Sequence, residues 1–142
     1  MPTNVLPVNE VAMAYLSAHN AHDVRAVGDL YAPAGRHREM ATGAERVGGD
    51  RIAEGLASFL KAFPDAAWDY EEPVIDGGRV AVAYWLTGTL RGSLGPFQPA
   101  GQALRLAGIV LIEIGTDGIQ STRDYWDAAA FGRQMQGPGA AS

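Results

Sequence analysis

Two stretches in the second half of the chain, 80–90 and 104–114, are apolar at successive positions and not only at alternate ones. Side chains alternate between the two faces of a strand, so a sheet with one wetted face would carry polar residues at every second position. Both faces of these two strands are therefore expected to be dry. We predict a strongly curved sheet that encloses an apolar cavity.

Short turns that contain glycine separate the strand-like segments 67–76, 79–92, 102–114 and 119–127. The turns fall at Gly77 and Gly78 and at the sequence TDG before residue 119. Strands joined by such short turns run antiparallel, and the pattern predicts an antiparallel meander.

The first half of the chain has helical periodicity. We predict helices over 9–17, 23–32 and 50–63, a short strand over 35–40, and a final helix over 128–136. Their expected N-caps are Asn9, Asp23 and Asp127, the pair Gly48–Gly49 before Asp50 sets up the third helix, and Pro33 and Pro64 end the second and third helices. In the third helix Ile52, Leu56, Phe59, Leu60 and Phe63 form one apolar stripe. The predicted fold class is α+β, a curved antiparallel sheet forming a cone with helices closing one face.

Composition limits the classes of protein. The 142 residues suit a single domain, 1–142, with its core at about 9–136 and a frayed tail at 137–142. The net charge of -5 argues against a nucleic-acid partner. No apolar run reaches the length of a membrane span, and the first ten residues lack signal-peptide features, so a cytoplasmic location is expected. Without cysteine there is neither a disulfide nor a thiolate site.

The segment 119–127, IQSTRDYWD, carries the leading catalytic candidate. Alternation places Asp124 and Trp126 on one face with Gln120 and Thr122. A carboxylate that faces an apolar interior beside an indole is costly unless it is paired or performs chemistry. We therefore predict that Asp124 is catalytic and that Asp127, at the joint between strand and helix, caps the helix.

Several segments together resemble the SnoaL-like polyketide cyclase family. They are HNAHDVRAVGDLYA, AFPDAAWDYEEPVIDGGRVAVAYWLTGTLRG, GPFQPAG and RDYWD, and the resemblance spans nearly the whole chain. It implies an α+β cone of the kind shared with nuclear transport factor two, ketosteroid isomerases and limonene epoxide hydrolases, usually dimeric and free of cofactors. It also implies that the acid on the last strand, here Asp124, transfers protons inside the cone.

One departure bears on the reaction. Epoxide hydrolases of this superfamily pair an arginine with an aspartate two residues later, and the matching positions here are Arg105 and Ala107. Without a second carboxylate at that place, water activation loses its geometric basis, so hydrolysis ranks below cyclisation. Arg105 itself has two interpretations: an edge residue whose stem lies along apolar surface, or a cation that keeps Asp124 ionised or binds an enolate.

The remaining candidates are a histidine and aromatic side chains. His37 lies with Glu39 in a charged strand, where it is either a surface residue or a proton shuttle. Candidate substrate contacts are Tyr15, Tyr84, Trp85, Trp126 and Phe59, with only one of Tyr84 and Trp85 facing inward. His19 and His22 lie one helical turn apart in an ordinary helix-to-loop sequence, and we predict no metal site.

The predicted function is a cofactor-free cyclase or isomerase that acts on a small, hydrophobic, polyketide-like substrate by enolate chemistry. Two alternatives remain open: a water-adding enzyme such as an epoxide hydrolase or dehydratase, and a non-catalytic small-molecule carrier on the same fold. The expected partners are that substrate and a second copy of the chain, because one helix layer and a cavity cannot cover all the apolar strand residues.

Overall fold

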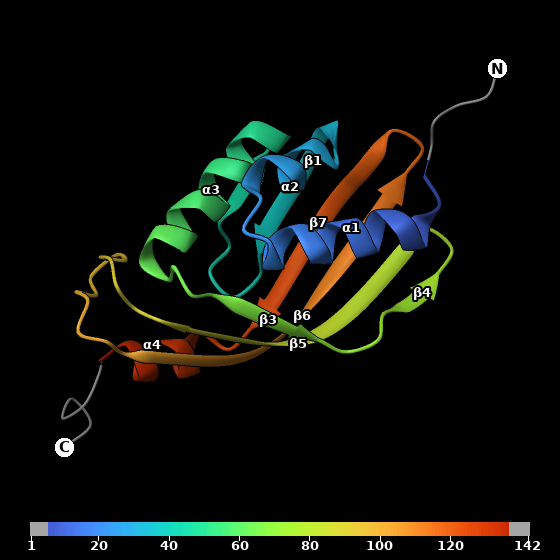
Figure 1. Cartoon of the computed structure of the whole chain (residues 1–142). Helices are drawn as coiled ribbons and strands as arrows, with labels where there is room; N and C mark the ends of the chain where they lie inside the picture. The colour runs from blue at the N-terminus through green and yellow to red at the C-terminus, as the bar shows by residue number, and fades with distance from the viewer. Residues whose placement is uncertain (1–5, 137–142) are drawn as a thin grey trace.

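The computed structural model describes residues 6–136, and the predicted tail at 137–142 lies outside them. Within that range the chain contains four helices and seven strands (Figure 1). In order they are α1 Val8–Asn20, α2 Val24–Asp29, β1 Tyr31–Glu39, β2 Glu45–Val47, α3 Gly49–Ala62, β3 Ala67–Tyr70, β4 Val74–Asp76, β5 Arg79–Thr89, β6 Ala103–Gly115, β7 Gly118–Trp126 and α4 Ala128–Gln136.

The strands form one curved, open sheet in the order β2-β1-β7-β6-β5-β3, with β4 also paired to β5. The predicted meander is confirmed from β3 to β7, where all pairings are antiparallel. The sheet departs from the predicted antiparallel pattern at one place, because β1 runs parallel to β7. That pairing joins segments far apart in the sequence, which local turn patterns cannot reveal.

The second helix is shorter than predicted. It ends at Asp29, and the chain is already a strand at Tyr31 and Ala32. A residue that precedes proline is pushed out of the helical region, and Ala32 precedes Pro33. The cap at Asp23 is confirmed, since its side chain accepts from the Ala26 amide at 3.0 Å. The Asn9 cap is wrong, because α1 begins one residue before it, after Pro7.

Helices α1, α2 and α3 cover the concave face of the sheet (Figure 1). The core lies between the two layers and contains the inward-facing residues of the long strands, among them Val80, Val82, Leu104 and Ile112. The expectation that both strand faces are dry is wrong for a single chain. The outer face leaves Trp85, Ile109 and Tyr125 between 39% and 49% exposed, so the cavity lies on the helix-covered side alone.

Two irregularities shift the strand registers next to the site. Pairing slips between Tyr31 and Arg36 in β1, where a Cβ on Gly35 would lie 2.5 Å from the Ile119 carbonyl oxygen. Only glycine permits that close approach. A second slip, between Glu113 and Ile114, buries Ile119 and leaves Gln120 exposed. Gln120 therefore does not share the inner face with Asp124, contrary to the alternation argument.

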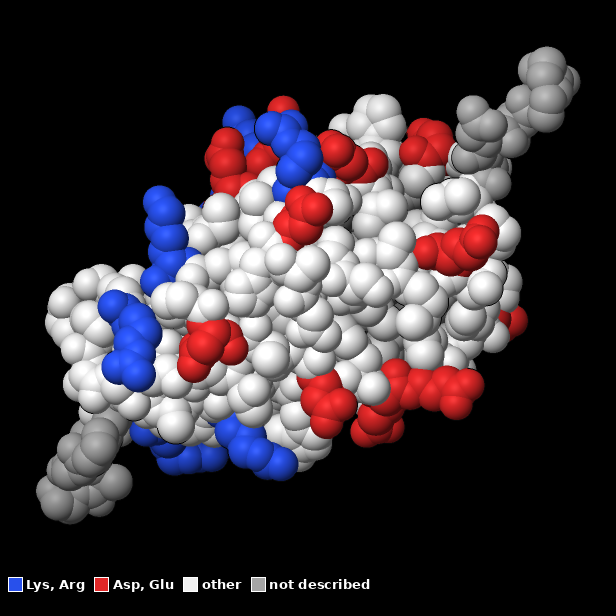
Figure 2. All heavy atoms as spheres, in the orientation of Figure 1, with Lys and Arg blue, Asp and Glu red and all other residues white. Residues whose placement is uncertain are grey.

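No helix within residues 6–136 is long and apolar enough to cross a membrane. On the face shown in Figure 2, the basic side chains lie in the left half and the acidic ones extend over both halves, without a continuous basic surface.

Candidate active site

A cavity of about 390 Å³ lies between the concave sheet face and the helices. Its walls are mainly apolar and aromatic, with Leu56 and Phe59 from α3, Trp68 from β3, and Leu106 and Val110 from β6. The third helix thus closes the interior as its apolar stripe predicted. A cavity of this kind, with a few polar groups at one place, is typical of a small-molecule site.

Six of the eight predicted site residues line this cavity: Asp124, His37, Tyr15, Tyr84, Trp126 and Phe59. The other two, Arg105 and Trp85, do not. They stack on each other on the outer face, with the guanidinium carbon 4.0 Å from the centre of the indole ring. The cavity role expected for Arg105 is therefore wrong. Leu104 and Leu106 are buried on either side of it, so alternation turns Arg105 outward.

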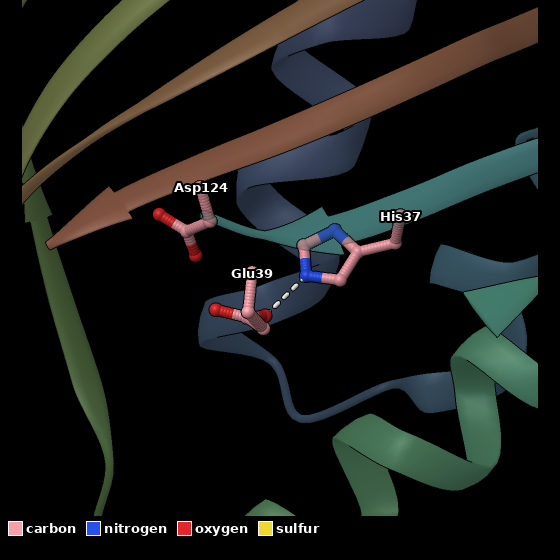
Figure 3. Close-up of side chains that lie close together, drawn as sticks. All are labelled: His37, Glu39 and Asp124. Atoms are coloured by element: carbon pink, nitrogen blue, oxygen red, sulfur yellow. Dashed lines mark hydrogen bonds and ion pairs between the residues drawn. The ribbon is translucent and has the colours of Figure 1, made fainter. Parts of the chain in front are cut away.

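The polar end of the cavity is built by two neighbouring strands. In the parallel pair, His37 lies beside Thr122 and Glu39 beside Asp124. Because these positions are two residues apart, all four side chains point to the same face. One ligand-type atom each from His37, Glu39 and Asp124 lies within 4.8 Å of the other two, and Figure 3 shows the three side chains converging.

Asp124 is a partly buried carboxyl group held by one strong hydrogen bond. The Tyr84 hydroxyl donates to its Oδ1 at 2.5 Å. Burial, together with the nearby charge of Glu39, raises the pKa of Asp124 to about 7, although the Tyr84 hydrogen bond acts in the opposite direction. Near neutral pH this group can both accept and return a proton, as a general acid–base requires.

Gly108 makes the bond between Tyr84 and Asp124 possible. It lies opposite Tyr84 on β6, and a Cβ at this position would come within 2.3 Å of the Tyr84 hydroxyl oxygen. The phenol crosses directly over the glycine to reach Asp124. A side chain here would displace the hydroxyl, so the glycine in the middle of β6 has a positional role.

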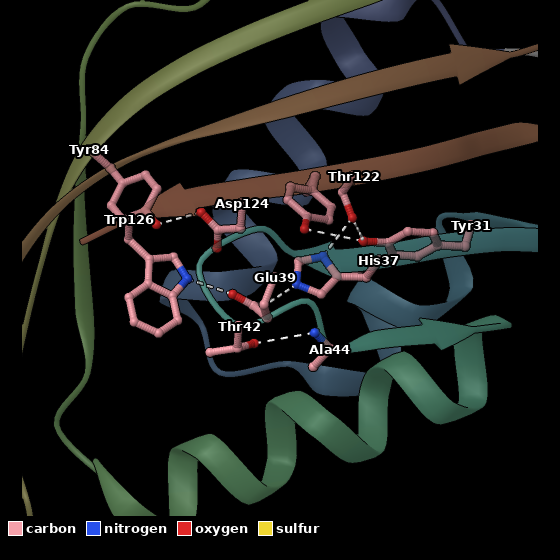
Figure 4. Close-up of polar contacts among 10 residues, drawn as sticks. Tyr31, His37, Glu39, Thr42, Ala44, Tyr84, Thr122, Asp124 and Trp126 are labelled. Carbon is pink, nitrogen blue, oxygen red and sulfur yellow. Dashed lines mark hydrogen bonds and ion pairs between the residues drawn. The ribbon is translucent and has the colours of Figure 1, made fainter. Parts of the chain in front are cut away.

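His37 belongs to a chain of hydrogen bonds that begins at α1 (Figure 4). The Tyr31 hydroxyl donates to that of Tyr15 at 3.2 Å, so the 2.6 Å contact between Tyr31 and Thr122 requires Thr122 to donate. The Thr122 oxygen then accepts from His37 Nδ1, at 2.7 Å. This leaves His37 Nε2 directed at Glu39, with which it forms a very short contact.

His37 and Glu39 form an ion pair in which His37 carries the proton. Burial alone would lower the pKa of His37, but the hydrogen bond to Glu39 and its charge outweigh burial and raise it. Burial likewise opposes ionisation of Glu39, yet His37 and a 2.7 Å hydrogen bond from Trp126 Nε1 lower its pKa. Both shifts favour a proton on His37 and a charge on Glu39. His37 is therefore not the surface residue of the alternative interpretation, since its side chain is only 18% exposed.

Glu39 is the functional residue that the sequence reasoning missed. The signal was present, because Glu39 follows His37 at a spacing of two on a predicted strand and so shares its face. His19 also lines the cavity, where its ring lies between those of Tyr15 and Trp68. This place in the cavity wall was not predicted either.

The same cluster has the donor set of a divalent metal site, two carboxylates and one imidazole. Each side chain also has an outer hydrogen-bond partner: Thr122 for His37, Trp126 for Glu39 and Tyr84 for Asp124. These three side chains can hold either a metal cation or a proton. In this structure His37 and Glu39 are hydrogen-bonded to each other.

The family is settled by a match over almost all of these elements. Residues 9–135, from α1 to α4, match the SnoaL-like polyketide cyclases. The chain belongs to that family. The resemblance seen in the sequence is thereby confirmed. No protein of curated function matches the chain.

Solved structures agree with the family on the fold. A protein from Jannaschia sp. CCS1, provisionally named a SnoaL-like polyketide cyclase, has a TM-score of 0.83 at 20% identity, covering 97% of this chain and 98% of its own. A hypothetical protein of ketosteroid isomerase-like fold from Catenulispora acidiphila DSM 44928 has a TM-score of 0.78 at 20% identity, with 94% and 96% covered. TerC, co-crystallised with polyporic acid, has a TM-score of 0.77 at 17% identity, with 93% and 100% covered. The predicted fold class is confirmed, with an open sheet.

Proposed function

We propose that this SnoaL-like protein is a cofactor-free cyclase or isomerase that makes and protonates an enolate of a small, polyketide-like substrate. The observation that carries the proposal is Asp124, a partly buried carboxyl group at the polar end of an apolar cavity with a pKa raised to about 7. The family and the aromatic cavity walls support the substrate class. TerC, which shares the fold, was crystallised with polyporic acid.

The mechanism uses two titratable sites, the carboxyl group of Asp124 and the pair of His37 and Glu39. Ionised Asp124 removes a proton from a carbon flanked by carbonyl groups, and the electron pair moves to the carbonyl oxygen to give an enolate. The positive charge of protonated His37, whose two N–H groups already bond Thr122 and Glu39, stabilises that oxygen electrostatically. In a cyclase the enolate carbon then attacks a second carbonyl of the same molecule, and protonated Asp124 returns its proton to the new alkoxide. In an isomerase the proton returns to a different carbon.

Hydrogen exchange tests the base without knowledge of the natural substrate. A suitable probe is 2-tetralone in D2O, a flat ketone whose α-hydrogens exchange when an enolate forms, followed by proton NMR. Asp124→Asn keeps the size of the side chain and removes the base, so enzyme-dependent exchange should fall by about 10²- to 10⁴-fold. A fold check by circular dichroism accompanies each variant.

Asp127→Asn is the matched control. The Asp127 side chain accepts from the amides of Ala129 at 2.9 Å and Ala130 at 3.2 Å, which confirms its capping role. Asparagine caps helices about as well as aspartate, so this variant should exchange like the wild type. Full activity of Asp124→Asn, or loss of activity in Asp127→Asn, would show that another group is the base.

Water addition is the second candidate function, and Glu39 now favours it. The sequence argument against hydrolysis was the missing second carboxylate on β6, but the structure supplies one from β1 beside Asp124. Two carboxylates and a histidine can orient and deprotonate a water molecule. Incubation of the enzyme with styrene oxide in H2¹⁸O distinguishes the reactions, since only hydrolysis places ¹⁸O in a diol. Binding of 2-tetralone without exchange would instead favour the carrier alternative.

A further inference from the structure

His19 stands apart from the acid cluster and is not used in the proposed reaction. It lies near the end of α1, where its ring packs between two aromatic rings. The centroid distances are 4.4 Å to Tyr15 and 5.2 Å to Trp68. All three residues line the cavity. The imidazole is thus a polar group fixed in an aromatic part of the wall.

The position of the His19 proton follows from its one hydrogen bond. Nδ1 lies 2.8 Å from the backbone carbonyl oxygen of Tyr15, one helical turn earlier. A carbonyl oxygen only accepts, so Nδ1 carries the hydrogen. Burial lowers the pKa of His19 to about 4, so the ring is neutral at pH 7. Nε2 therefore presents a lone pair, which makes it an acceptor.

That acceptor is free in the described part of the chain. Within residues 6–136 no group donates to His19 Nε2, and no fully buried side-chain nitrogen or oxygen there lacks a partner. Nε2 is therefore accessible and not fully enclosed by protein atoms. His19 is one of the residues that line the cavity.

We propose that Nε2 of His19 is a binding subsite for a hydroxyl group of the ligand, and that the cavity therefore selects flat, hydroxylated aromatic or enolic compounds over their ethers. The inference rests on the proposed function only in taking the cavity as the substrate site. A ligand without a donor at this point leaves a desolvated acceptor unpaired, which is unfavourable. An anionic group is also disfavoured there, because the lone pair repels it, so the hydroxyl binds in its neutral form.

Two probes that differ in one donor test this subsite: 2-naphthol and 2-methoxynaphthalene, titrated by calorimetry at pH 7. The wild type should bind the naphthol roughly 3- to 10-fold more tightly, the range expected for one hydrogen bond. His19→Phe keeps a flat ring and removes the acceptor, so it should bring that ratio to about 1 with little change in affinity for the ether.

The matched control is His22→Asn. His22 Nε2 contacts the Ala66 carbonyl oxygen at 2.6 Å outside the cavity, and asparagine tolerates the positive φ of 56° at this position. This variant should keep the wild-type ratio. Asp124→Asn should also keep it, whether or not exchange of 2-tetralone is lost, which separates this proposal from the proposed function.

Three outcomes would overturn the subsite. They are equal binding of both probes by the wild type, a folded His19→Phe that still prefers the naphthol, and an Asp124→Asn variant that has lost this preference. If His19→Phe does not fold, ¹⁵N NMR of histidine-labelled wild type decides. The His19 Nε2 resonance should report an unprotonated nitrogen and shift with 2-naphthol but not with the ether. A protonated Nε2 would refute the proposal.

Discussion

Replacing Asp124 by asparagine should make the protein more stable at alkaline pH relative to the wild type. The pKa of Asp124 is raised from 3.8 to about 7 in the folded state, chiefly by burial. A carboxyl group with a raised pKa binds its proton more tightly when folded. It therefore favours folding fully below pH 3.8, and that contribution is lost as the pH rises through about 7.

The size of the effect follows from the same shift. One pKa unit corresponds to about 1.4 kcal/mol. The stability contributed by Asp124 changes between pH 3.8 and about pH 7, and an experiment from pH 5 to pH 8 covers about two units of that range. The free energy of unfolding of the wild type should therefore fall by about 3 kcal/mol more than that of Asp124→Asn over this interval. Urea denaturation followed by circular dichroism at the two pH values measures the difference.

Asp65→Asn serves as the control with the opposite shift. Hydrogen bonds from Thr89, at 2.8 Å from both its amide and its hydroxyl, lower the pKa of exposed Asp65 below 3.8. Asp65 is therefore ionised in both folded and unfolded chains from pH 5 to 8, and its replacement should not alter the pH dependence. If Asp124→Asn behaved like Asp65→Asn, the carboxyl would not sit in a desolvated cavity, and the reasoning on its basicity would be refuted.

Three further predictions concern the site and the assembly. In pH profiles of 2-tetralone exchange, Glu39→Gln should move the acidic limb to lower pH and Tyr84→Phe to higher pH, because they remove opposite influences on Asp124; shifts in the same direction would contradict this. Exchange should persist after dialysis against EDTA, and activity restored only by added metal would refute a proton-based mechanism. We also propose a dimer through the exposed outer face, so sedimentation should give twice 15.0 kDa for the wild type and a smaller mass for Ile109→Asp; a wild-type monomer would disprove it.

Local sequence rules predicted the site where side-chain spacing alone was sufficient. Asp124 and Trp126 were placed inward by the period of two, and α3 was placed over the cavity by its apolar stripe. The same rule fails at Gln120, because the register slips at this residue, between Ile119 and Ser121. For Arg105 the sequence leaves both a cavity cation and an edge residue open, and the burial of Leu104 and Leu106 on either side of it decides for the outer face.

The sequence by itself determined the α+β class, the strand meander, the caps at Asp23 and Asp127, and a buried acid on the last strand. These features depend on neighbours a few residues apart, whose periodicity and turn chemistry are written along the chain. Only the tertiary structure decided that β1 lies parallel to β7. That pairing brings Glu39 and His37 to Asp124 across more than half of the sequence. Burial then raises the pKa of Asp124, while the mutual hydrogen bond and charges set those of His37 and Glu39.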